Sequence, residues 1–242
     1  MKKASLSIGL VLCASAALTR ATPSTTYWTP ACSDIQPYRV LHVGIDNYFT
    51  IGKKASSGEQ GSFPTDVGLT IGVLPFEKLQ MEVGVDALYP SDYPYYLNGK
   101  IGTPENALFS HSPALNVGIL NVGLKHGVTD QNVLDAVAGV TLPYGLGRLH
   151  AGAYAGNRKV LVNGDGKADA AGWMIGYDRV LIPDKLSIAA DYMSGDNALG
   201  GGGVGLSYSF DKNVSLLFGP VWFNDKAVNG ATKWTAQLDV NL

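Results

Sequence analysis

The chain contains little cysteine and little charge, and each shortage limits what the protein can be. Of its two cysteines, Cys13 falls in an apolar stretch near the amino terminus, so a mature protein would keep Cys32 alone. A single cysteine forms no intramolecular disulfide, which excludes a disulfide-stapled secreted fold. Charged residues make up 16% of the chain, against about 25% in soluble domains. A protein whose outer surface contacts lipid would show this deficit.

Beyond its first residues the chain also lacks a long apolar run. No later segment approaches the roughly 20 apolar residues that a membrane-spanning helix needs, so a helical membrane protein is excluded. At the amino terminus, two lysines precede an apolar stretch over residues 4–18 that is too short to span a bilayer. Small residues follow, with cleavage expected after Ala16 or Ala21, so residues 1–21 are predicted to be a cleaved signal peptide. Its removal takes away three bases and no acid, which lowers the formal net charge from −2 to −5 and argues against a nucleic-acid partner.

The chain is rich in alternating apolar and polar residues, and the alternation is strictest at the carboxyl end. Within residues 234–242, Trp234, Leu238 and Leu242 fall on one face, whereas Asp239 and its polar neighbours fall on the other. A period of two is that of a strand with one apolar and one polar face. A strand of this kind that ends an exported chain resembles the closing strand of a bacterial outer-membrane β-barrel of the porin-like class.

This resemblance implies one all-β domain over residues 40–242. The expected fold is a single transmembrane antiparallel up-and-down β-barrel of about twelve strands, with ten or fourteen as alternatives. An even number lets both ends of the barrel lie in the periplasm. Residues 22–39 are then expected to form a periplasmic amino-terminal segment.

Clusters of glycine, proline, asparagine and aspartate divide the domain into short alternating segments. In the fifth segment the alternation shifts by one residue, which predicts a β-bulge near Leu120. The predicted strands cover residues 41–51, 66–73, 79–87, 95–101, 115–125, 134–142, 149–155, 172–177, 186–193, 204–210, 214–222 and 234–242.

The lengths of the connections fit a barrel with short periplasmic turns and longer outer loops. One connection does not fit this pattern, because Gly102–Pro113 is long although it falls at the periplasmic end, where the other turns are short. A helical turn over residues 104–109 or a misplaced fourth strand would explain it. The short set is 76–78, 143–147, 180–185 and 211–213, and the long set is 52–62, 158–169, 196–202 and 225–231.

The two faces differ in composition, which matters because alternation also fits a soluble periplasmic sandwich or a lipocalin-like barrel. The polar face is rich in glycine interleaved with single carboxylates, as a crowded interior would be. The apolar face carries aromatic residues near the strand ends, where the polar tips of tyrosine and tryptophan would reach the edges of a bilayer. We therefore expect the apolar face to contact lipid. The aromatic residues are Phe49, Tyr89, Tyr192, Trp222 and Trp234 toward the outer rim, and Tyr177 and Phe210 toward the periplasmic rim.

The charged residues of the polar face are mostly acidic. Asp46 and Asp239 become neighbours when the first and last strands pair. Carboxylates that face a narrow channel of low dielectric favour cations and repel anions. The alternative is a packed polar interior, in which the acids bond to the few bases and to tyrosines such as Tyr48 and Tyr154. The pore-lining candidates are Asp46, Asp66, Glu82, Asp86, Lys100, Asp135, Arg148, His150, Asp191 and Asp239.

No group of residues predicts an enzyme, a metal site or a cofactor. An outer-membrane phospholipase would resemble this barrel, but it needs a serine and a histidine on the outward wall, and the apolar stripe has neither. His126 with Asp130 is the one candidate for a protease pair of the omptin type. The loop 163–169 is similar to the middle of a calcium-binding loop, but the ends of that motif lack oxygen ligands here.

These features predict a β-barrel of the outer membrane of a Gram-negative bacterium, acting as a small pore with an acidic lumen that tolerates cations. The alternative is a non-conducting structural barrel whose outer loops bind a partner, and a soluble periplasmic lipocalin-like barrel is less favoured. The expected partners are outer-membrane lipid, the assembly machinery of that membrane, and small hydrophilic solutes or cations.

Overall fold

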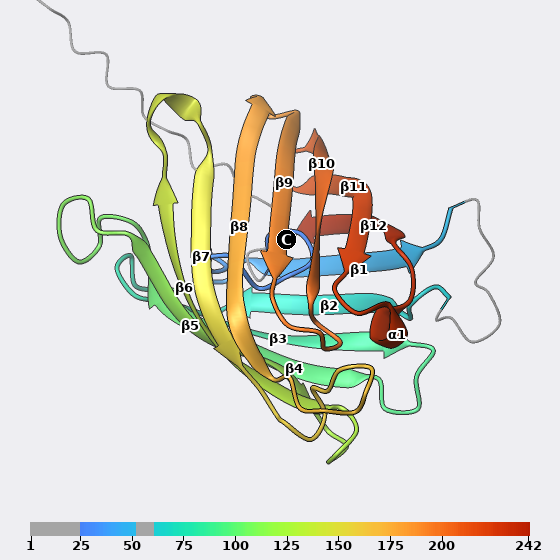
Figure 1. Cartoon of the computed structure of the whole chain (residues 1–242). Coiled ribbons are helices and arrows are strands. Elements are labelled where there is room, and N and C mark those ends of the chain that lie inside the picture. Colours follow the sequence, from blue (N-terminus) through green and yellow to red (C-terminus); the bar gives the residue numbers. More distant parts are fainter. Residues whose placement is uncertain (1–24, 52–60) are drawn as a thin grey trace, which may run out of the picture.

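The computed structural model describes residues 25–51 and 61–242. The predicted signal peptide and most of the predicted loop 52–62 lie outside the described residues. Twelve antiparallel strands form one closed ring, in which each strand pairs with its neighbours in the chain and β1 pairs with β12 (Figure 1). This confirms the all-β up-and-down barrel, with twelve strands rather than ten or fourteen.

The strands follow the predicted alternation closely. The largest difference is in the eighth strand, which runs to Ile182 because its pairing with β9 continues past Tyr177, although the alternation of apolar and polar residues ends there. The bounds are β1 Leu41–Phe49, β2 Thr65–Gly72, β3 Gln80–Tyr89, β4 Tyr95–Thr103, β5 Ala114–Gly123, β6 Asp130–Thr141, β7 Arg148–Ala155, β8 Ala171–Ile182, β9 Leu186–Met193, β10 Gly201–Asp211, β11 Val214–Phe223 and β12 Lys233–Asn241.

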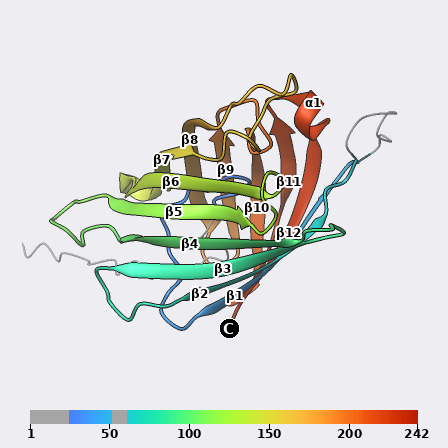
Figure 2. The ribbon, with the colours of Figure 1, turned by 90° about the horizontal axis from the view of Figure 1, so that it is seen from below.

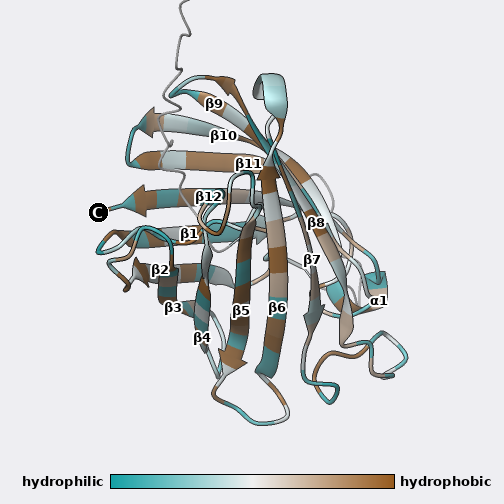
Figure 3. Cartoon of the chain, turned by 90° about the vertical axis from the view of Figure 1, so that its left-hand side faces the viewer, coloured by the Kyte–Doolittle hydropathy of each residue, from teal (hydrophilic) through white to brown (hydrophobic). Residues whose placement is uncertain are grey.

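Side chains alternate between the two surfaces of the wall. Leu69 and Leu134 are 42% and 60% exposed on the outside, whereas the next residues, Thr70 and Asp135, are buried. Figure 3 shows the resulting apolar bands along the strands. A closed barrel offers these outward side chains no partner within the chain, and a closed ring is the sheet form that satisfies all backbone groups in lipid. The predicted assignment of faces is confirmed, and it excludes the compact core of a soluble sandwich.

Aromatic side chains lie at the ends of the strands, as predicted. Tyr89 and Phe210 are 48% and 58% exposed at opposite ends of the barrel. Trp234 stacks on Phe218 with ring centroids 5.2 Å apart. Tyrosine and tryptophan rings, which are apolar with a polar tip, favour the two boundaries between membrane and water.

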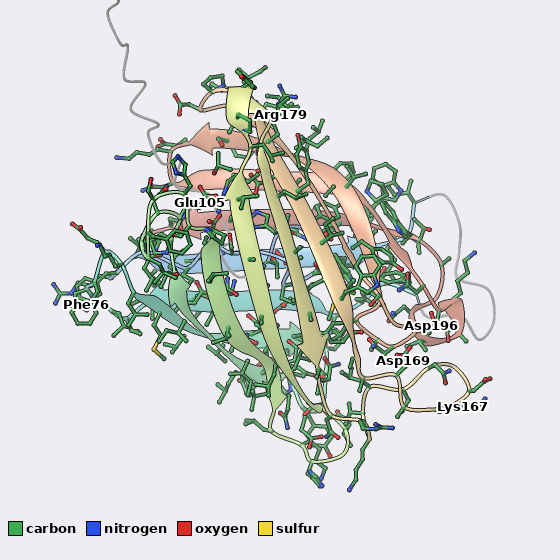
Figure 4. All side chains as sticks on the ribbon, turned by 60° about the vertical axis from the view of Figure 1, so that its left-hand side comes forward. Phe76, Glu105, Lys167, Asp169, Arg179 and Asp196 are labelled. Atoms are coloured by element: carbon green, nitrogen blue, oxygen red, sulfur yellow. The ribbon has the colours of Figure 1, made fainter. Side chains whose placement is uncertain are left out.

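The two ends of the barrel differ in their connections. Figure 4 labels Phe76, Glu105 and Arg179 at the end that carries the short turns, and Lys167, Asp169 and Asp196 at the opposite, loop-bearing end. The long connection after β4 does not arise from a misplaced strand, because β4 is present.

The connection between β4 and β5 is a series of turns rather than the helical turn considered for residues 104–109. Asn106 and His111 have positive φ angles of 63° and 64°, which interrupt a helix. The side chain of Asn106 instead accepts a hydrogen bond from the backbone N–H of His111 at 2.8 Å. The helical turn, one of the two explanations considered from the sequence, is wrong because local side-chain bonds stabilise the turns.

The β-bulge predicted near Leu120 is confirmed. The register between β5 and β6 shifts between Leu120 and Val122, and Asn121 adopts a φ of 52°. Leu120 packs inward against a buried cluster that includes Val133, while the alternation resumes with the opposite phase. The described residues contain two short helical turns, η1 (Pro143–Gly145) and α1 (Lys226–Asn229), and no helix among them is long and apolar enough to cross a membrane.

The segment that precedes β1 runs inside the ring of strands (Figures 1 and 2). Tyr27, Ala31 and Gln36 are at most 2% exposed. We call residues 25–38 the inner segment. Residues 22–39 were expected to lie in the periplasm, and this expectation is corrected for the part described: hydrogen bonds with inward-facing strand residues hold the inner segment in the lumen.

Candidate functional site

All ten charged or histidine residues predicted on the polar face point into the barrel, but they have two different surroundings. One group borders an open cavity, and the other contacts the inner segment. The first group is Asp46, Asp66, Asp86 and Asp239; the second is Glu82, Lys100, Arg148, His150 and Asp191, with Asp135 buried nearby on β6.

Four carboxylates from four adjacent strands border a cavity of about 370 Å³. Asp46 on β1 lies opposite Asp66 on β2, which makes them cross-strand neighbours. Asp239 on β12 and Asp86 on β3 complete the group. The first and last strands therefore pair as predicted, although Asp46 lies opposite Gln237 rather than Asp239.

Glycines on this wall leave room for the carboxylates. Gly68 lies opposite Asp86, and a Cβ on Gly68 would come within 2.8 Å of Oδ1 of that aspartate. The other oxygen of Asp86 accepts a hydrogen bond from Asn98 Nδ2 at 2.5 Å. His42 Nε2 lies 3.5 Å from Asp239 Oδ1. Small residues beside acids thus keep the acids directed at open space, as the glycine-rich composition of this face suggested.

Aromatic rings form much of the remaining cavity wall. Trp28 of the inner segment meets Tyr48 edge to face at 5.2 Å between ring centroids, and Phe63 lies 5.9 Å from Tyr48. Tyr96 on β4 also borders the cavity, and no lysine or arginine among the described residues does. Carboxylates and aromatic faces both attract cations. The cavity wall therefore combines acidic and aromatic groups without a basic side chain among the described residues.

A buried carboxylate fixes the start of the inner segment. Oδ2 of Asp191 accepts the backbone N–H groups of Tyr27, Trp28 and Thr29 at 2.9, 2.8 and 2.7 Å. Successive N–H groups directed at one anion form a backbone nest. Asp191 is 5% exposed, so these bonds replace the water that the charge has lost.

Bases of the wall hold the middle of the inner segment. Arg148 Nη1 donates to both carboxylate oxygens of Asp34 at 2.6 Å. Lys100 Nζ donates to the carbonyl oxygens of Cys32 and Asp34 at 3.4 and 3.2 Å and lies 3.9 Å from Glu82 Oε1. The packed polar interior considered from the sequence is thus present on this side of the barrel, with Arg148 bound to an acid of the inner segment.

Ser33, His150 and Asp178 form a line of hydrogen bonds with the composition of a hydrolytic triad. Ser33 Oγ lies 3.0 Å from His150 Nδ1, and His150 Nε2 lies 2.9 Å from Asp178 Oδ2. The backbone N–H of Ser33 donates to the same Nδ1 at 3.1 Å, so that nitrogen accepts and Nε2 donates to Asp178. Ser33 and His150 are at most 4% exposed and border neither described cavity. The arrangement connects the inner segment to β7 and β8 rather than presenting a nucleophile.

The other chemical candidates occupy loops. His126 Nδ1 lies 2.9 Å from Asp130 Oδ2, so this pair forms, but the same carboxylate accepts the N–H of Gly127 and closes the turn before β6. In the calcium-like loop, Asn163 Oδ1 accepts the N–H groups of Asp165 and Lys167 at 3.1 and 2.9 Å. Both sets of contacts stabilise local turns.

Sequence reasoning missed Ser33, Asp34 and Asp178. Asp178 follows Gly176 on the inward face of β8, so an extension of the predicted eighth strand would have found it. The two residues of the inner segment gave no signal, because their partners lie more than a hundred residues away.

Cys32 offers a way to detect the position of the inner segment. It is 4% exposed, and burial raises the pKa of its thiol to about 11, with Asp34 adding to the shift. Because the thiolate is the reactive form, we expect a maleimide to modify Cys32 much more slowly in the folded barrel than in the SDS-unfolded chain. Mass spectrometry of timed samples would measure the two rates. Equal rates would contradict the buried position of the inner segment.

No family model matches the chain, and no curated protein matches it. Among solved structures, one described as the KdgM porin aligns with a TM-score of 0.55 at 9% identity, covering 83% of this chain and 99% of that one. The NanC porin aligns with a TM-score of 0.50 at 8% identity, covering 84% and 98%. Outer membrane phospholipase A from Escherichia coli aligns with a TM-score of 0.43 at 14% identity, covering 86% and 94%.

The likeness to the two porins concerns the fold. Combined with the closed ring and the outward apolar face, it defines the chain as a transmembrane β-barrel of the bacterial outer-membrane type.

Proposed function

We propose that this barrel is an outer-membrane channel for small hydrophilic solutes and that its lumen prefers cations. The observation that carries the proposal is the cavity bordered by Asp46, Asp66, Asp86 and Asp239 without a lysine or arginine among the described residues. In a narrow space of low dielectric, fixed carboxylates lower the energy of a cation and raise that of an anion.

The selectivity of the conducting barrel tests this proposal. We expect the purified mature chain in a planar bilayer to show discrete conductance and a cation-selective reversal potential in a KCl gradient. The double variant Asp46→Asn, Asp66→Asn should lose much of that preference, because it removes two of the four charges at the cavity. Asp165→Asn is a control for loss of charge away from the cavity, since it removes one carboxylate from an exposed outer loop. Anion preference in the wild type would rule the proposal out.

An enzymatic role is not part of the proposal. Within the described strands, the outward positions carry neither serine nor histidine, the pair that a phospholipase of this architecture needs. The line Ser33–His150–Asp178 is buried against the inner segment.

A second candidate function is a non-conducting barrel whose outer loops bind a partner. Its support is the order of those loops: Asp225 Oδ2 accepts the N–H of Gly164 at 2.8 Å, and Asp169 Oδ2 accepts that of Asp196 at 2.5 Å. Such bonds preorganise a binding surface. Shortening the exposed loop tip 164–168 should then abolish binding of the partner while leaving the barrel folded. Binding that survives the deletion would rule this candidate out.

A further inference from the structure

The inner segment occupies lumen space that the barrel does not need to fill in order to close. All twelve strand pairings, including β1 with β12, involve residues 41–241 alone. The inner segment joins the sheet only through a bridge between Tyr38 and Gly72. Its removal from the lumen would therefore leave every strand ladder intact.

The inner segment is held by hydrogen bonds and ion pairs at a few anchors, and by apolar packing of Tyr27 and Ala31. The first anchor is Asp191, whose Oδ2 accepts three consecutive backbone N–H groups. Gln237 supports it by donating to the carbonyl oxygen of Tyr27 at 3.0 Å. The hydrogen bonds at this anchor can be exchanged for water one at a time.

The barrel wall also lies very close to Tyr27, next to the first anchor. The ring of Tyr27 lies against Gly203 and Gly205, where an added Cβ would come within 2.1 and 2.5 Å of ring atoms. Its hydroxyl donates to the carbonyl oxygen of Pro220 at 3.1 Å. The glycines of the wall thus leave a space that fits the Tyr27 ring. The inner segment therefore binds at a defined position in the lumen.

The second anchor reaches toward the loop-bearing end. Trp28 Nε1 donates to the carbonyl oxygen of Leu199 at 2.9 Å, and its ring packs against Tyr48, Phe63 and Phe223. Trp28 also borders the acidic cavity. The seated segment therefore narrows the space next to the carboxylates.

We propose that the inner segment is a displaceable plug that limits conductance, and that Asp191 is the latch that holds it. This inference rests on the proposed channel function and adds its regulation. When the plug leaves, the open path through the lumen widens. The wall groups that now contact the plug, among them Glu82, Lys100, Arg148 and Asp191, then line that path. Two states with different conductance follow from one closed barrel.

The variant Asp191→Asn tests the latch because it keeps the side-chain size and removes the charge that attracts the three N–H groups. Loss of one charge-assisted hydrogen bond changes an equilibrium by about tenfold or more. We therefore expect the rate of Cys32 modification by a maleimide in proteoliposomes to rise about tenfold, with a parallel severalfold rise in conductance. Asp165→Asn, with the same chemical change on an exposed loop, should alter neither rate nor conductance.

The outcomes separate this inference from the channel function. If Cys32 is modified faster and both proteins conduct equally, the plug is overturned and the channel function is retained. Faster modification without conductance in either protein means that the channel function fails. Unchanged modification in a variant that keeps heat-modifiable gel migration overturns the latch. If Asp191→Asn does not fold, Trp28→Ala gives the same readouts from a substitution outside the strands, and unchanged rate and conductance there overturn the plug.

Discussion

Replacing Lys100 with methionine is expected to lower the free energy of unfolding by about 3–5 kcal/mol. Lys100 and Glu82 are each 2% exposed, and their charged atoms lie 3.9 Å apart. Methionine has a similar volume but no charge, so it leaves the Glu82 carboxylate buried without this cation. It also removes the donor to the carbonyl oxygens of Cys32 and Asp34. Urea unfolding in lipid vesicles, followed by tryptophan fluorescence, would measure the change.

Two controls isolate the effect of the buried charge. The double variant Glu82→Gln, Lys100→Met should recover much of the lost stability, because no uncompensated carboxylate remains and glutamine can still accept the N–H of Gln36. Lys167→Met removes an equal charge from a side chain that is 78% exposed, and it should change stability by no more than about 0.5 kcal/mol. A Lys100→Met barrel as stable as the wild type would show that water reaches this pair.

The wall of the barrel could be predicted because each strand meets two different environments. Lipid requires apolar side chains at every second position, and the lumen permits glycine and acids at the others, so the sequence repeats with a period of two. The pattern located β9 at Leu186–Met193 and even the bulge at Leu120. It failed at the connection after β4, where the side chain of Asn106 rather than periodicity determines a turn.

The inward direction of the candidate residues could be predicted, whereas their partners could not. Alternation places Asp46 and Asp191 on the same surface of the wall, yet the first borders a cavity and the second is enclosed by backbone N–H groups. That difference is created by the inner segment, whose residues have no period. Tyr27 meets Asp191 across 164 residues of sequence, and nothing local to either residue reports the contact.

Replacing Leu206 with arginine is expected to destabilise the barrel by about 2–4 kcal/mol. Leu206 lies near the middle of β10, between Ile188 on β9 and Phe218 on β11, and it is 47% exposed on the outward surface. At that depth a bilayer offers no water or counter-charge, so the guanidinium must bend toward a membrane boundary or thin the bilayer. Equilibrium unfolding in vesicles measures the loss, and impaired folding would appear as reduced heat-modifiable migration.

The neighbouring variant Ser207→Arg provides the decisive comparison. Ser207 has the same depth and strand but faces the interior, where it borders a second cavity of about 80 Å³ together with polar residues such as Ser187 and Asp211. An arginine there can reach water and a carboxylate, so we expect a much smaller loss than at Leu206. Because the two positions share backbone, register and substituent, the difference between them reports the environment of each face alone. An equal loss at both would mean that the outward surface of β10 does not contact hydrocarbon.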